Sequence, residues 1–175
     1  MFDKPYQVHN SGFQASQNEK YLTGTHNFSF KTEQFKYRVK VDHYENDILI
    51  IKYHRRMDQG SNRFNILSGE YKCSRIIATC IDILVNLFKK KPSASFGFLG
   101  SHTVVDGKPE EKKEKTKRFR VYKMAIENKI GDNIFLHNMD ESKSAYLMIN
   151  RKNPDPERIS NEAKRMFIEL YQLFE

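Results

Sequence analysis

Several features that would point directly to a class of protein are scarce or missing here. The chain has 175 residues, no tryptophan and only two cysteines. No apolar run approaches the ~20 residues that a membrane-spanning helix needs. Residues 1–21 are polar and lack the apolar segment of a secretory signal peptide. These absences predict a cytoplasmic protein with no membrane partner.

Motifs of common catalytic and cofactor sites are also missing. The chain has no G-x-x-x-x-G-K-[ST] phosphate loop, no G-x-G-x-x-G, no H-E-x-x-H, no C-x-x-C and no G-x-S-x-G. The histidines show no pair at metal-ligand spacing; they are His9, His26, His43, His54, His102 and His137. We therefore expect no metal and no cofactor, and the sequence favours a protein that is not an enzyme.

The two cysteines lie seven residues apart in a predicted helix. Cys73 and Cys80 therefore point to the same side of that helix, about two turns apart, too far for a disulfide between them. We interpret them as small core side chains of a protein from a reducing compartment.

The chain does have an excess of positive charge. Lys and Arg number 30 against 22 Asp and Glu, which gives a formal net charge of +8. The excess lies in two stretches, residues 36–56 with six cations and three acids, and residues 108–123 with eight cations and three acids. A basic domain attracts polyanions, of which nucleic acid is one.

Hydrophobic periodicity predicts an α+β fold with a mostly antiparallel sheet and three helices, in the order β-β-β-β-α-β-α-β-β-α. We expect strands at 27–31, 35–43, 48–53, 63–67, 94–99, 134–136 and 145–150, and helices at 70–90, 117–130 and from 155 to the C-terminus. Residues 1–25 are expected to form an irregular polar arm on a single domain that spans 26–175. Residues 100–116 are expected to form a mobile charged loop.

The two charged stretches indicate which residues could bind a polyanion. Strand 35–43 alternates apolar and basic side chains, so its basic side chains should share one solvent face. If this strand meets the start of helix 117–130, the two clusters would form a groove for RNA or single-stranded DNA. The candidates are Lys36, Arg38, Lys40, Arg55, Arg56, Lys117, Arg118 and Arg120. Nearby rings are either base-stacking platforms or, as their periodicity favours, core: Phe35, Tyr37, Tyr53, Phe119 and Tyr122.

Two other functions remain open. The polar arm and the outward pair Val121 and Met124 fit a protein-interaction module, such as an antitoxin-like or phage-defence subunit, with a protein partner or a homodimer. A metal-free nuclease or toxin would use His54 as acid and base beside Arg55 and Arg56. The same three residues also fit a solvated strand end.

Two resemblances bear on the fold. The run from Phe96 to Gly100 (FGFLG), followed by Arg118 to Tyr122 (RFRVY) and Ile126, resembles a pattern in small bacterial proteins without an assigned activity, over roughly residues 70–150. Four leading strands and a helix resemble, in topology alone, the β-β-β-β-α units of Pur-alpha and Whirly single-strand-binding proteins. Likeness of topology implies a fold and not a function.

Overall fold

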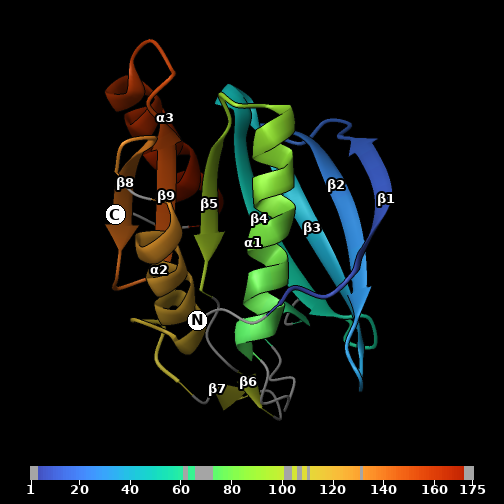
Figure 1. Ribbon diagram of the computed structural model, residues 1–175. Coiled ribbons are helices and arrows are strands. Elements are labelled where there is room, and N and C mark those ends of the chain that lie inside the picture. The colour runs from blue at the N-terminus through green and yellow to red at the C-terminus, as the bar shows by residue number, and fades with distance from the viewer. Residues whose placement is uncertain are drawn as a thin grey trace.

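A computed structural model of the protein describes residues 4–60, 63–65, 73–100, 104–105, 108–109, 111–130 and 132–171. Within them lie a seven-stranded sheet, a two-stranded hairpin and three α-helices (Figure 1). The strands are β1 (Val8–Ala15), β2 (Leu22–Lys31), β3 (Lys36–Tyr44), β4 (Ile48–Arg55), β5 (Ser95–Leu99), β6 (Val104–Val105), β7 (Lys108–Pro109), β8 (Phe135–Asp140) and β9 (Ala145–Asn150). The helices are α1 (Cys73–Lys90), α2 (Lys117–Lys129) and α3 (Pro156–Tyr171), with short 3₁₀ turns η1 (Glu45–Asp47) and η2 (Arg63–Asn65).

The large sheet has the strand order β1-β2-β3-β4-β5-β9-β8. Only β4 and β5 pair in parallel, across the connection that contains α1, and every other neighbouring pair is antiparallel. This architecture confirms the predicted α+β class. No helix among the described residues is long and apolar enough to cross a membrane.

One face of the sheet is covered by α1 and α2. Apolar side chains of β2 to β4, such as Val39, Val41 and Ile51, are buried there with Ile77 and Cys80 of α1. Burial raises the pKa of both cysteine thiols, which keeps them protonated in this core. The prediction that Cys80 is a core side chain is confirmed, and Cys73 lies partly buried at its margin.

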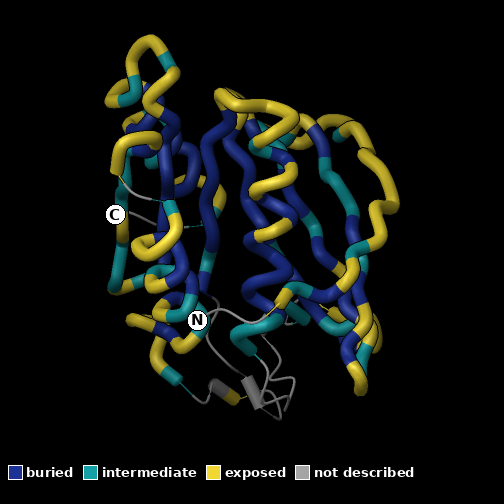
Figure 2. The backbone as a smooth tube through the Cα atoms, in the orientation of Figure 1, coloured by how far each residue is buried: buried dark blue, intermediate teal, exposed yellow. Residues whose placement is uncertain are grey.

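The other face is covered over only part of its width. Helix α3 buries Ile159, Ala163 and Phe167 against Ile48 and Ile149 of β4 and β9. Strands β4, β5 and β9 are therefore buried along their length, whereas β1 is exposed (Figure 2). Consequently no helix among the described residues covers the half of this face formed by β1 to β3 and the end of β4.

The N-terminal segment differs from its prediction. Residues 1–25 do not form an irregular arm, because residues 8–15 are strand β1 and pair with β2. The strand was missed because it lies at the sheet edge with seven of its eight residues exposed, so no apolar alternation marks it. A bulge between Asn10 and Gly12 also shifts the alternation by one residue.

The predicted strand 63–67 is also corrected. Residues 63–65 form the 3₁₀ turn η2, and the rest of the segment lies outside the described residues. On its β4 side, strand β5 pairs with Ile48 to Ile51, and the ring of Phe64 packs against His54 in the later part of β4. The first four strands of the chain are therefore β1 to β4, and the predicted set of four that ended with strand 63–67 is wrong.

The loop 100–116 contains the hairpin β6–β7 and lies partly outside the described residues, so its mobility stays a prediction.

Candidate functional site

The open part of the sheet carries most of the polar side chains of β1 to β4. Strand alternation turns Tyr37 and Val39 into the core, so Lys36, Arg38 and Lys40 project from the opposite face. The same face continues onto β2, because the strand register places Ser29 of β2 opposite Arg38. We call the surface of β1 to β4 that α3 leaves uncovered the open face.

The open face contains a broad hollow of about 800 Å³. Five cations line it, and we name them the basic band: Lys31, Lys36, Arg38, Lys40 and Arg56. Six other side chains that line it are polar, and we name them the polar band: Gln7, His9, Ser11, Gln14, Asn27 and Ser29. No Asp or Glu is among the lining residues, so the net charge of the hollow is positive.

The cations of the basic band are available to a ligand. Lys36, Arg38 and Arg56 are exposed, and Lys40 is half-buried. Arg56 is held beside Lys36, because its backbone N–H donates to the Lys36 carbonyl at 2.7 Å. None of the five cations forms an ion pair with an acid in the part of the chain that the structure describes. Unpaired cations on one surface attract a polyanion rather than stabilise the fold.

A sixth cation, Lys52, lies opposite Lys40 in the strand register and does not line the hollow. Lys52 of β4 forms an ion pair with Asp42 at 2.8 Å and donates to the Tyr171 hydroxyl at 3.2 Å. Burial lowers the pKa of Lys52, but Tyr171 and Asp42 outweigh that effect and raise it overall. Lys52 is therefore a charged structural residue at the boundary of the open face.

His54 lies on the open face but is largely buried, with 7% of its surface exposed. Its Nδ1 lies 2.7 Å from the Arg55 carbonyl, and the ring of Phe64 packs edge-on against it at 5.1 Å. Burial lowers the pKa of His54, and the cations Arg63, Lys40 and Arg38 lower it further. A covered, neutral imidazole suits a structural role better than acid–base chemistry on a substrate.

Arg55 points to the other side of the strand. Its Nε and Nη2 atoms donate to the Asp58 carboxylate at 2.8 and 2.9 Å, and its guanidinium lies 4.8 Å from the centre of the Phe35 ring. The cluster of His54, Arg55 and Arg56 is therefore divided between two surfaces. Of these three residues, only Arg56 lines the hollow.

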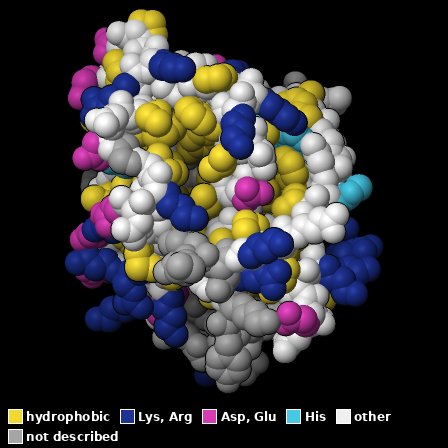
Figure 3. All heavy atoms as spheres, in the orientation of Figure 1, with side chains coloured by type: hydrophobic (Ala, Val, Ile, Leu, Met, Phe, Trp, Pro, Cys, Tyr) yellow, Lys and Arg dark blue, Asp and Glu magenta, His cyan; other side chains and the backbone are white. Residues whose placement is uncertain are grey.

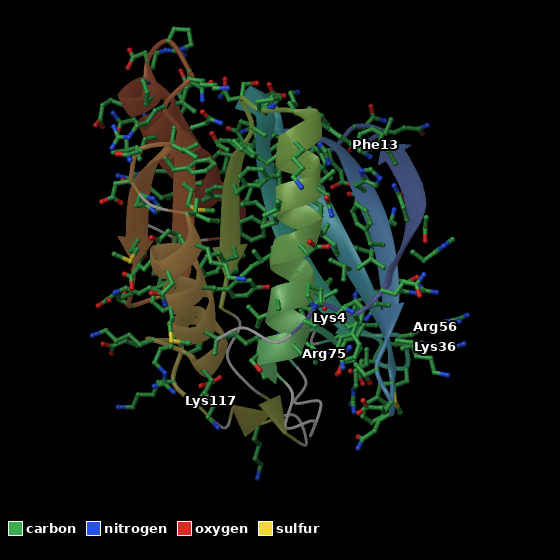
Figure 4. The ribbon with its side chains drawn as sticks, in the orientation of Figure 1. Lys4, Phe13, Lys36, Arg56, Arg75 and Lys117 are labelled. Carbon is green, nitrogen blue, oxygen red and sulfur yellow. The ribbon has the colours of Figure 1, made fainter. Side chains whose placement is uncertain are left out.

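The second predicted cluster lies on the covered face. Helix α2 packs its buried residues Phe119 and Tyr122 against that core. Lys117 and Arg120 are exposed to solvent on the helix, and Figure 4 shows Lys117 far from the adjacent pair Lys36 and Arg56. The two charged clusters do not meet, so the predicted single groove does not form.

Arg118 in this cluster is partly buried. Its guanidinium lies 4.8 Å from the centre of the Tyr53 ring, and its Nη1 donates to the Phe64 carbonyl. It therefore ties α2 to β4 and η2. This placement gives Arg118 a structural role in the fold.

The aromatic rings near the two clusters belong to the core. Tyr37, Tyr53, Phe119 and Tyr122 are buried, and Phe35 packs against Arg55. No Phe or Tyr belongs to the polar band or the basic band, and their one aromatic ring is the exposed imidazole of His9. The open face thus offers mainly contacts to phosphates and polar groups, with His9 as the one ring of the two bands that could stack on a base.

The polar band and Lys31 were missed by sequence reasoning. β1 carries no clear periodic signal, so its three members of the polar band had no predicted element: His9, Ser11 and Gln14. A usable signal was present in β2, where Asn27, Ser29 and Lys31 alternate with the buried Phe28 and Phe30.

Comparison with known proteins does not identify a relative, since no family model, curated protein or solved structure matches this chain.

Proposed function

We propose that this protein binds nucleic acid, RNA or single-stranded DNA, on the open face of its sheet. The observation that carries the proposal is the hollow of about 800 Å³ lined by five cations and no acid. Lys and Arg that contact phosphates release counterions, which drives association without regard to sequence. The proposed location is the cytoplasm, and the proposed role is that of an accessory protein.

The arrangement of the cations supports a chain-like ligand over a small anion. Lys36, Arg38 and Lys40 occupy alternate positions of β3, so their Cα atoms are spaced by roughly 7 Å along the strand. A row of spaced charges fits successive phosphates of an extended backbone. Because the two bands hold a single ring, the His9 imidazole, contacts to the backbone supply most of the affinity.

Charge reversal on the two faces tests this proposal with a matched control. Arg38→Glu with Arg56→Glu changes the open face, and Lys117→Glu with Arg120→Glu changes the net charge equally on α2. We expect the first pair to weaken binding of a labelled single strand at least about tenfold, and to lower the salt dependence of affinity. The second pair should alter affinity by less than about threefold, since distant surface charges are largely screened. Equal losses in both, or no binding at low salt, would reject the proposal.

One observation favours the alternative of a protein-interaction module. An apolar hollow of about 190 Å³ lies between α1 and α2, and Figure 3 shows apolar side chains gathered on that face. Val85 and Ile134 at the hollow are partly exposed, as is Met124 of α2, while Val121 packs against the core. Light scattering tests this alternative: a stable homodimer that a Val85→Asp change dissociates would support it.

A further inference from the structure

The open face is divided into a charged half and an uncharged half. Cations project from β3 and from the end of β4, and Lys31 extends them to the end of β2. The polar band on the remainder of β2 and on β1 presents hydroxyl, amide and imidazole groups. A ligand that covers the hollow therefore meets phosphate-binding groups on one side and hydrogen-bonding groups on the other.

Two side chains of the polar band lie directly beside the cations. The strand register places Ser29 opposite Arg38, and Asn27 opposite Lys40. Cβ atoms of such cross-strand pairs are about 5 Å apart. Ser29 and Asn27 are both half-buried, and neither side chain has a hydrogen-bond partner within the described residues. By contrast, the neighbouring Thr25 hydroxyl donates to Asp42 at 2.8 Å.

The separation of about 5 Å within these cross-strand pairs is comparable to the distance from a phosphate to the neighbouring sugar in a nucleotide. The group covalently next to a phosphate is the sugar, so a backbone bound along β3 brings its sugars over Asn27 and Ser29. A serine hydroxyl and an asparagine amide each donate and accept hydrogen bonds. The ribose 2′-hydroxyl does the same, and it is the group that distinguishes RNA from DNA.

We infer that Asn27 and Ser29 contact the ribose 2′-hydroxyl and that the ligand of the open face is RNA in preference to DNA. This inference rests on the proposed function. The cations of β3 hold the phosphates, and the two uncharged side chains of β2 select the sugar.

Fluorescence anisotropy with one sequence prepared as RNA, as DNA and as 2′-O-methyl RNA tests the inference on the unaltered protein. We expect RNA to bind about tenfold more tightly than DNA, which corresponds to one or two net hydrogen bonds. The 2′-O-methyl strand, which cannot donate from that oxygen, should bind like DNA.

A second experiment uses the double variant Asn27→Ala, Ser29→Ala. It should lose the preference for RNA while it keeps its DNA affinity and its salt dependence. Asn128→Ala on α2, an exposed amide on the other face, should keep the full preference. Equal binding of RNA and DNA by the unaltered protein would overturn this inference alone. Failure to bind either strand at low salt would overturn the proposed function together with it.

Discussion

Neighbouring residues of the same charge have different roles in this protein. Arg55 and Arg56 are adjacent in sequence, yet one forms a bidentate pair with Asp58 and the other faces the open hollow. Arg118 likewise packs on Tyr53 between the exposed Lys117 and Arg120. A run of cations in the sequence therefore contains both structural and available side chains, and the strand or helix period decides between them.

Arg118→Ala should destabilise the fold. The change removes the donor to the Phe64 carbonyl and the group that packs on Tyr53, which we expect to cost about 1–3 kcal/mol. Urea unfolding measures the loss, with the exposed Arg120→Ala as a control that should remain within about 0.5 kcal/mol. Unchanged stability combined with lost nucleic-acid affinity would instead make Arg118 a binding residue, as the charge pattern suggested.

At the scale of elements, the segments with strong hydrophobic periodicity were predicted well. The alternation in 35–43 and the aliphatic run from Ile48 correspond to β3 and the central β4, and the predicted hairpin is β8–β9, although β8 extends to Asp140 where the prediction ended at 136. β1 was missed, because an edge strand is held by backbone hydrogen bonds to β2 that leave no trace in side-chain composition. Its absence from the prediction removed half of the polar band.

The segment before β1 is anchored to α1 by specific contacts. The Tyr6 backbone N–H donates to the Thr79 hydroxyl at 2.9 Å, and its ring stacks on Phe30 with centroids 5.6 Å apart. Arg75 of α1 lies over the Tyr6 ring and donates to the Lys4 carbonyl at 2.8 Å; Figure 4 labels Lys4 and Arg75. These contacts join the first strand to the main core.

Tyr6→Ala should therefore loosen β1 as well as reduce overall stability. Removal of a buried ring costs about 3–5 kcal/mol in well-packed cores. Hydrogen exchange should show the amides of β1 opening before those of β3 and β4. The exposed Phe13→Ala provides the comparison, with a smaller loss because 54% of that ring is already accessible. Uniform exchange along all four strands would contradict this account.

Two histidines, His26 within β2 and His43 near the end of β3, should make stability depend on pH. Burial lowers the pKa of His26 and of His43, and the buried Nε2 of His43 has no hydrogen-bond partner in the described structure. The unfolded state then binds protons more tightly than the folded state, so the free energy of unfolding should fall as pH falls below about 6.5.

The variant His43→Leu measures this contribution. It should flatten the dependence of stability on pH between neutral pH and about 5, because it removes one of the groups that titrate there. His9→Leu, at an exposed position of β1, should leave the slope nearly unchanged. The expectation fails if both variants keep the slope of the unaltered protein.

At the scale of the whole molecule, the sheet separates the two charged stretches that the sequence made prominent. Composition revealed the net charge of +8, and alternation correctly assigned Lys36, Arg38 and Lys40 to one solvent face. Whether these cations lie beside those of α2 depends on which face of the sheet the chain crosses after β5. The sequence of that connection has only weak hydrophobic periodicity, so the relative position of the two clusters could not be predicted without the structure.

The central claim is that nucleic acid contacts the open face and not the face of α1 and α2. The most direct measurement is a titration of the ¹⁵N-labelled protein with a single-stranded RNA, followed by amide chemical shifts. We predict that the largest changes fall on β2, β3 and the end of β4, around Ser29, Arg38 and Arg56. Changes confined to α2 around Lys117 and Arg120, or no changes at low salt, would contradict the account.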